Sequence, residues 1–203
     1  MKEGKNIMEN SKMAENNYVC LSGVISEECV FSHEVYGEGF YIFKTEVKRL
    51  SENEDILPVT VSERLIDINS LKRGMTVNVM GQMRSYNHYS SKKNKLILTT
   101  FAKEIEIGED ILANPNEIFL NGFICKTPVY RTTPFGREIT DLLIAVNRSY
   151  GKSDYIPCIA WGRNAKFAGG LEVGNNIEIW GRVQSRNYQK KLENDEIEER
   201  TAY

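Results

Sequence analysis

The chain has 203 residues, a formal net charge of −2 and 41% hydrophobic residues, which is ordinary for a folded protein of one or two domains. Its apolar runs are shorter than the roughly 18 residues that a membrane span needs, and its N-terminus lacks the apolar stretch of a signal peptide. Four cysteines without a CxxC pair, and only two histidines, disfavour a metal centre or a disulfide framework. We therefore expect reduced thiols, no cofactor, no membrane contact and a cytoplasmic location.

The sequence repeats itself about once every hundred residues. Residues 17–25 return as 116–124, and residues 72–87 return as 172–187, with matching glycine and apolar positions. Such a period indicates two copies of one domain. We expect four regions: a flexible N-terminal arm (1–16), a first domain (17–108), a linker (109–116) and a second domain (117–203).

Each copy is expected to consist of short β segments separated by turn residues. Apolar and polar residues alternate at 77–80 and again at 176–180, which is typical of strands. In the second copy the predicted strands are Ile118–Lys126, Ile139–Val146, Tyr155–Trp161, Ile177–Ser185 and a last one at the C-terminus. One short helix follows the third strand of each copy, at Glu63–Ile68 and Arg163–Ala168. This order predicts an all-β protein made of two tandem OB-folds, which are five-stranded Greek-key barrels.

Charge is distributed unevenly along the chain. Residues 117–192 carry 11 Lys/Arg against 6 Asp/Glu, whereas residues 1–116 carry 14 against 17 and residues 193–203 carry 1 against 5. The second copy is therefore basic within an acidic chain. This favours a polyanionic partner, because Lys and Arg neutralise phosphates. A solvated surface with uneven charge is the alternative explanation from charge alone.

Aromatic residues accompany this charge. Tyr155 and Trp161 are six residues apart in one strand, and an even spacing places both on the same face. Tyr150 precedes that strand and Tyr188 follows the fourth one, and basic residues flank both: Arg148, Lys152, Arg186, Lys190 and Lys191. Sequence-independent binding of a single strand needs flat side chains for stacking and cations that follow the backbone. The second copy supplies both.

Packing in the core is the alternative explanation for a strand tryptophan. We expect Trp161 to be exposed, because it shares its face with a tyrosine, and we expect Trp180 in the core, because its counterpart in the first copy is a methionine. Phe135, at a turn close to Arg131, either contacts a ligand or covers the barrel.

The first copy lacks the strand aromatics. Ile56 and Ser62 stand where the second copy has Tyr155 and Trp161. The loop after its fourth strand keeps aromatic and basic residues: Tyr86, His88, Tyr89, Lys92 and Lys93. We therefore expect the second copy to be the main binding platform and the first copy to be an auxiliary binder or a dimerisation partner.

Six blocks of the second copy carry a family resemblance: Asn116–Ile124, Tyr130–Gly136, Ile144–Arg148, Ile159–Gly162, Val173-Gly174 and Ile179–Tyr188. In this order they resemble the OB-fold of bacterial single-stranded DNA-binding proteins, over about residues 116–190. The resemblance implies sequence-independent binding and protection of single-stranded DNA in replication, recombination and repair, by a nucleoid-associated protein. It places the base-stacking aromatics of the family at Tyr150, Tyr155, Trp161 and Tyr188. Family assemblies usually contain four OB-folds, so two per chain imply a homodimer.

Two features depart from that family. The flexible Gly/Pro-rich tail with an acidic tip, through which such proteins recruit other enzymes, is not seen, so replication or repair proteins stay open as partners. The acidic run 193–199 aligns with the loop before the last strand, and Tyr203 aligns with Lys103. We therefore expect either an abbreviated last strand or a fragment.

Other functions were weighed against this one. An enzyme is not expected, because Gly151-Lys152-Ser153 lacks the first glycine of a phosphate-binding loop and no paired His/carboxylate set is seen. An OB-fold accessory or primosomal interaction protein with weak nucleic-acid affinity is the main alternative. Binding of RNA or oligosaccharides is a third reading, since the same barrel face supports it.

Overall fold

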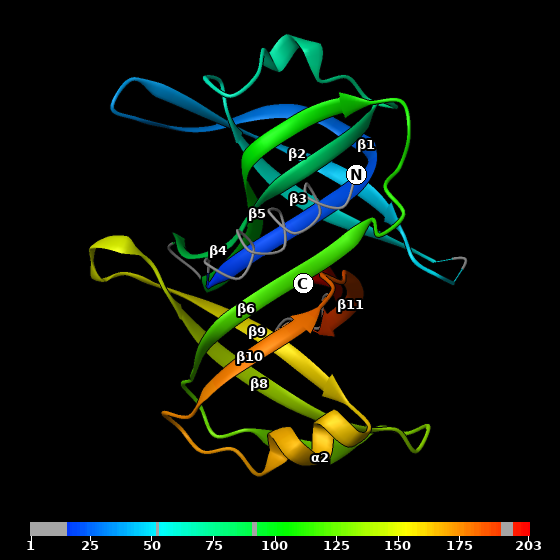
Figure 1. Ribbon diagram of the computed structural model, residues 1–203, viewed down its shortest axis with the longest axis vertical. Coiled ribbons are helices and arrows are strands. Elements are labelled where there is room, and N and C mark those ends of the chain that lie inside the picture. Colours follow the sequence, from blue (N-terminus) through cyan, green and yellow to red (C-terminus); the bar gives the residue numbers. More distant parts are fainter. Residues whose placement is uncertain (1–15, 52, 91–92, 192–196) are drawn as a thin grey trace, which may run out of the picture. The chain divides into compact units, whose positions relative to one another are not determined.

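The computed structural model describes residues 16–51, 53–90, 93–191 and 197–203, and these are mostly β-structure (Figure 1). The strands are β1 (Asn17–Val35), β2 (Glu38–Lys48), β3 (Glu54–Ser62), β4 (Thr76–Ser90), β5 (Lys93–Gly108), β6 (Asn116–Ile124), β7 (Val129–Thr132), β8 (Glu138–Asn147), β9 (Ser153–Trp161), β10 (Asn176–Gly181), β11 (Arg186–Lys191) and β12 (Ile197–Ala202). Within these residues no helix is long and apolar enough to cross a membrane.

The chain forms two compact units, and their boundaries differ from those of the sequence repeat. The described residues of one unit come from the ranges 1–18, 83–98 and 119–180. Those of the other come from 19–82, 99–118 and 181–203. We call them the β9 unit and the β3 unit. Each therefore combines most strands of one copy with the fourth-strand hairpin of the other copy.

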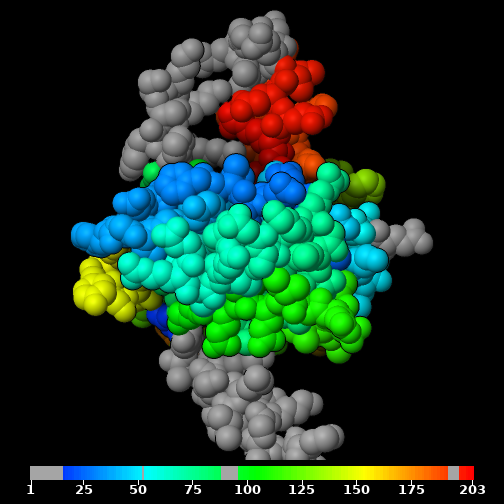
Figure 2. All heavy atoms as spheres, turned by 90° about the horizontal axis from the view of Figure 1, so that it is seen from above, coloured from blue at the N-terminus to red at the C-terminus, as the bar shows by residue number. Residues whose placement is uncertain are grey.

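In the β3 unit the first copy closes into a barrel. Strand β1 pairs with β2 and β4, β2 pairs with β3, and β3 runs parallel to β5 beside β4. Fully buried apolar side chains fill its interior, among them Leu21, Phe43, Leu57, Val59 and Val77. Figure 2 looks onto this barrel, whose segments from β1 (blue) to β5 (green) form a packed surface.

Glycine is required where two barrel strands approach each other closely. A Cβ atom at Gly23 would overlap the carbonyl oxygen of Glu46, and one at Gly81 would overlap that of Phe101. Glycines inside strands allow this close approach and the bending by which a sheet curls into a barrel.

In the β9 unit the second copy builds its sheet on β8, which pairs with β6, β7 and β9, while β10 pairs with β6. Helix α2 (Arg163–Gly169) follows β9, as the sequence predicts, and packs on β8. Ala165 is buried there, and its carbonyl oxygen accepts a hydrogen bond of 2.7 Å from the Thr140 hydroxyl. Ile124, Ile144 and Ile156 add to this core.

Two predicted elements differ from the structure. In the first copy Glu63–Leu65 are turns, and the helical element is only a 3-10 turn, η1 (Ile68–Ser70). The Asp67 carboxylate accepts the Asn69 N–H at 3.0 Å, and such local bonds compete with an α-helix. In the second copy the fourth strand stops at Gly181 rather than Ser185, and the separate hairpin β11–β12 follows.

Candidate nucleic-acid interface

The outer face of β9 is a row of exposed flat and apolar side chains. Tyr155, Ile159 and Trp161 are 47%, 50% and 48% exposed, whereas Ile156 between them is buried. The alternation expected from the sequence is therefore present, and pairing with β8 along the whole strand holds it in register. This row offers a stacking surface next to a rigid sheet.

The turn before β9 presents Tyr150 at a backbone conformation that disfavours tyrosine. Its φ is 63° and its ψ is 33°, and the side chain is 99% exposed. The left-handed region costs a residue with a Cβ roughly 1–2 kcal/mol. A fully exposed ring has little packing to offset that cost, so the strained position suggests a role in contact with a ligand. Lys152 follows in the same turn, and its carbonyl oxygen accepts the Arg148 N–H at 2.7 Å.

Phe135 lies at the tip of the turn between β7 and β8. Its side chain is 91% exposed, so it does not cover the barrel. Arg131 on β7 forms a bidentate pair with Asp141, at 2.6 and 3.1 Å, and this pairing raises the pKa of the arginine. Any phosphate contact by Arg131 has to share the guanidinium with that carboxylate.

Arg148 faces a buried carboxylate. Its Nε lies 3.1 Å from Oδ2 of Asp154, whose side chain is fully buried. Nη1 of Arg84 approaches the same oxygen at 3.0 Å. Arg148 was predicted from the sequence to contact phosphate, whereas Asp154 and Arg84 were not predicted to belong to the site.

The predicted first-copy site residues lie on a hairpin that joins the β9 unit. Tyr86 is half-exposed on β4, and burial of its ring raises the pKa of its hydroxyl. It follows Ser85, whose Oγ accepts the Tyr155 N–H at 2.7 Å. His88 and Tyr89 continue β4 and Lys93 begins β5, while Lys92 lies outside the described residues.

The predicted basic loop of the second copy is a strand. Arg186, Tyr188, Lys190 and Lys191 all lie on β11, which belongs to the β3 unit. Tyr188 is half-exposed and pairs across the hairpin with Arg200. The structure thus places Tyr86 in the same unit as Tyr155 and Trp161, next to the serine that bonds the Tyr155 backbone, and it assigns Tyr188 to a different unit.

Comparison with known proteins identifies the second copy. Residues 115–201 match the single-strand binding protein family. This segment, which is less than half of the chain, is therefore similar to that family. Over 83 residues it is 35% identical to single-stranded DNA-binding protein 1 of Staphylococcus aureus (strain COL) and 34% identical to single-stranded DNA-binding protein A of Bacillus subtilis (strain 168). These alignments cover 37% of this chain, and they cover 50% and 48% of the two relatives. The chain spans about half the length of the curated relatives it matches.

A solved structure of the single-strand binding protein family supports the fold of both copies. The wild-type single-stranded DNA-binding protein from Thermus aquaticus superposes with a TM-score of 0.68 at 20% sequence identity, over 84% of this chain and 85% of that chain. The prediction of an all-β protein with tandem OB-folds is confirmed.

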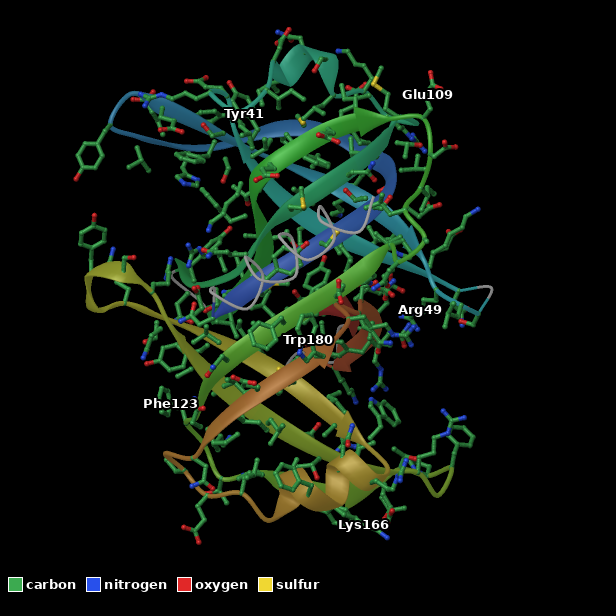
Figure 3. All side chains as sticks on the ribbon, in the orientation of Figure 1. Tyr41, Arg49, Glu109, Phe123, Lys166 and Trp180 are labelled. Atoms are coloured by element: carbon green, nitrogen blue, oxygen red, sulfur yellow. The ribbon has the colours of Figure 1, made fainter. Side chains whose placement is uncertain are left out.

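One prediction about this family segment is wrong. Trp180 is not in the core: it is 50% exposed, although its ring packs against Phe119 with centroids 4.6 Å apart. Its strand, β10, pairs with β6 alone among the described residues, so one side of the ring stays open. Phe123 on β6 is also exposed, and Figure 3 labels both side chains.

The cysteines are free thiols. Cys20 is buried, and Cys29, Cys125 and Cys158 are partly so. Desolvation raises the pKa of the Cys158 thiol to about 12, which keeps it protonated at neutral pH. Within the described ranges no three His, Cys, Asp or Glu residues gather as a metal site would require.

Proposed function

We propose that the protein binds single-stranded DNA without sequence preference. Bases stack on exposed aromatics, and Lys and Arg contact the phosphates. The observation that carries this proposal is the exposed row Tyr155, Ile159 and Trp161 on β9. A base stacked on an aromatic side chain contributes about 1–3 kcal/mol, and every base has a face to stack. Two relatives named as single-stranded DNA-binding proteins support the same function.

The nucleic-acid contacts that we propose in the β9 unit are Tyr86, Tyr89, His88, Lys93, Arg131, Phe135, Arg148, Tyr150, Lys152, Tyr155 and Trp161. Those in the β3 unit are Arg186, Tyr188, Lys190 and Lys191. Lys92, which lies outside the described residues, is proposed as well. We also propose roles in replication, recombination and repair at the nucleoid, and the family resemblance supports them.

We also propose that two chains associate, so that the assembly holds four OB-folds. Closed two-fold symmetry is the commonest arrangement for such a homodimer. Light scattering at micromolar concentration tests it, and a monomer at every concentration would exclude it.

Binding of a fluorescently labelled oligo(dT), followed by anisotropy, tests the main proposal. We expect tight binding that weakens steeply as salt is raised, because bound counterions are released from the phosphates. Duplex DNA of the same length should bind far more weakly, because its bases are already stacked. Equal affinity for duplex and single strand would contradict the stacking mechanism. Tighter binding of RNA of the same sequence would identify RNA as the preferred ligand.

A second candidate function is favoured by the β1–β2 hairpin. Val30, Phe31 and Tyr36 are exposed on it, and residues 27–38 contain four Glu and no Lys or Arg. An acidic surface repels phosphates, so this hairpin suits a protein partner better than DNA. Weak oligonucleotide binding with little salt dependence would favour an accessory interaction protein.

A further inference from the structure

A buried aspartate of the second copy binds the hairpin of the first copy. In the β9 unit, Oδ1 of Asp154 accepts the Ser85 backbone N–H at 2.6 Å. Ser85 returns a bond, because its Oγ accepts the Tyr155 N–H at 2.7 Å. Arg84 and Arg148 neutralise the carboxylate at 3.0 and 3.1 Å. We call Asp154, Ser85 and the two arginines the β9 clasp.

The same arrangement occurs with the copies reversed. In the β3 unit, Oδ1 of Asp55 accepts the Ser185 N–H at 2.6 Å, and the Ser185 Oγ accepts the Ile56 N–H at 2.9 Å. Arg49 donates to both oxygens of Asp55, at 2.8 and 2.6 Å, and this hydrogen bonding raises the pKa of the arginine. Arg49 also donates to the Ser185 carbonyl oxygen at 3.0 Å. We call Asp55, Ser185 and Arg49 the β3 clasp.

The two clasps use repeat-related residues. Asp55 and Asp154, Arg49 and Arg148, and Ser85 and Ser185 are identical pairs at the spacing of the repeat. The neighbouring residues differ, since Ile56 corresponds to Tyr155. The clasp is therefore common to both copies even where the stacking face is not.

Two hairpins are exchanged between the copies: β4–β5 joins the β9 unit, and β11–β12 joins the β3 unit. Each exchanged hairpin is also held by an asparagine of its own copy. The Asn17 side chain donates to the Met83 carbonyl oxygen at 2.7 Å and accepts the Met83 N–H at 2.8 Å. Asn116 does the same with Val183, at 2.8 and 2.9 Å. Each anchored residue lies two positions before the clasped serine, so the start of the hairpin is held from both sides.

We propose that Asp154 and Asp55 are positioning residues that fix the exchanged hairpins, so that the DNA-binding surface of the β9 unit is composite. Tyr155 and Trp161 come from the second copy, and Tyr86, next to the clasped Ser85, comes from the first. This proposal rests on the proposed function. It gives the first copy a defined part in binding: it supplies a ring to the β9 row, and its own Asp55 holds the β11 hairpin.

The chemistry of each clasp explains why removing its aspartate should loosen the hairpin of the opposite copy. Burial of a carboxylate is costly unless hydrogen bonds and opposite charge compensate it, and each clasp supplies both. Removing the carboxylate leaves a backbone N–H and a guanidinium without their acceptor. The loss falls on the hairpin residue that donates, and this residue belongs to the opposite copy.

Hydrogen exchange of two matched variants tests the cross-copy link. In Asp154→Asn we expect the amides of β4 after Met83 to exchange about tenfold faster or more, with little change on β11. Asp55→Asn should give the reverse pattern. Ser85→Ala, which removes only the hydroxyl, should give a weaker form of the Asp154→Asn pattern and serves if that variant folds poorly. Loosening of both hairpins alike, or of neither, would overturn the proposal.

A double-mutant cycle on DNA affinity tests the composite surface. Asp154→Asn alone should weaken oligo(dT) binding about five- to tenfold, and Tyr86→Ala alone by a similar factor. The two together should lose little more than either one, because the carboxylate acts through that ring. Asp154→Asn and Tyr188→Ala should instead be additive. A purely structural role would make both combinations additive, and that result would overturn the composite surface.

The two readouts separate this proposal from the proposed function. If the unmodified protein does not bind single-stranded DNA, the proposed function fails, and hydrogen exchange still decides whether the clasps position the hairpins. If the protein binds DNA but exchange shows no cross-copy effect, the positioning role alone fails.

Discussion

Strands β3 and β9 occupy the same place in the two copies, but they present different outer faces. Along β9 the outward residues are exposed rings and an isoleucine. Along β3 the equivalent positions hold Ile56 and Pro58, which are half-buried, and Thr60 and Ser62, which are buried. The copies therefore share a framework and a clasp, while one of them offers a stacking surface.

The partners of β3 account for its closed face. β3 pairs with β5, and the Thr60 hydroxyl lies 2.8 Å from that of Thr99. The Ser62 hydroxyl donates to the Glu38 carboxylate. Thr60 and Ser62 are buried there, and their small hydroxyl side chains are satisfied by these hydrogen bonds. The absence of aromatic side chains on β3 therefore accompanies the closure of the first barrel.

The largest effect should come from removing the β9 rings. The double variant Tyr155→Ala, Trp161→Ala should lose about 2–6 kcal/mol of oligo(dT) affinity, at about 1–3 kcal/mol for each stacked base. Both side chains are half-exposed, so the variant should stay folded in a thermal melt. Ile56→Ala in β3 is the matched control, and it should leave affinity nearly unchanged. If it weakened binding as much as the β9 variant, the asymmetry between the strands would be wrong.

Exchange of the hairpins leads to a second prediction. Tyr86→Ala should cost about 1–3 kcal/mol of affinity, the value of one stacked base, because Tyr86 directly follows Ser85, which bonds the Tyr155 backbone. Tyr188→Ala should cost less, because strand β3 carries no aromatic side chain equivalent to Tyr155 or Trp161. Equilibrium titrations of both variants at one salt concentration check this order, and the reverse order would place the main surface in the β3 unit.

The Tyr150 turn should show opposite effects on stability and on binding. Asparagine tolerates a positive φ better than tyrosine does, so Tyr150→Asn should stabilise the fold by about 1 kcal/mol. The same change removes an exposed ring and should weaken oligo(dT) binding by about 1 kcal/mol, the lower end of one stacked base. Thermal unfolding and binding are measured on the same sample. A variant that is both more stable and fully active would remove Tyr150 from the site.

The smallest effect should come from the charge at this turn. The first copy has Asn53 where the second has Lys152. Lys152→Asn should weaken binding modestly and lower the slope of log affinity against log salt by about 1, as expected for one phosphate contact. Titrations at four salt concentrations measure the slope. An unchanged slope would show that Lys152 does not contact phosphate.

Local patterns in the sequence predicted the parts of the structure that depend on near neighbours. Alternation along β9 identified the common face of Tyr155 and Trp161, and the helix after β9 was predicted from its position. The early end of the fourth strand at Gly181 and the exchange of hairpins were not predicted from the sequence. Both depend on partners far away in the chain, since Asp55 and Ser185 are 130 residues apart. The sequence feature that could have predicted the exchange is the recurrence of the clasp residues Arg, Asp and Ser in both copies.

Trp161 itself provides the most direct test that β9 is the DNA-binding face. The chain has two tryptophans, so Trp180→Phe leaves Trp161 as the sole tryptophan reporter. This variant is titrated with oligo(dT) and with a duplex of equal length, while anisotropy of the labelled DNA monitors binding independently. We expect the single strand to quench Trp161 emission to saturation in step with the anisotropy, and the duplex to leave it nearly unchanged. Tight binding of the single strand with unaltered Trp161 emission would contradict the account.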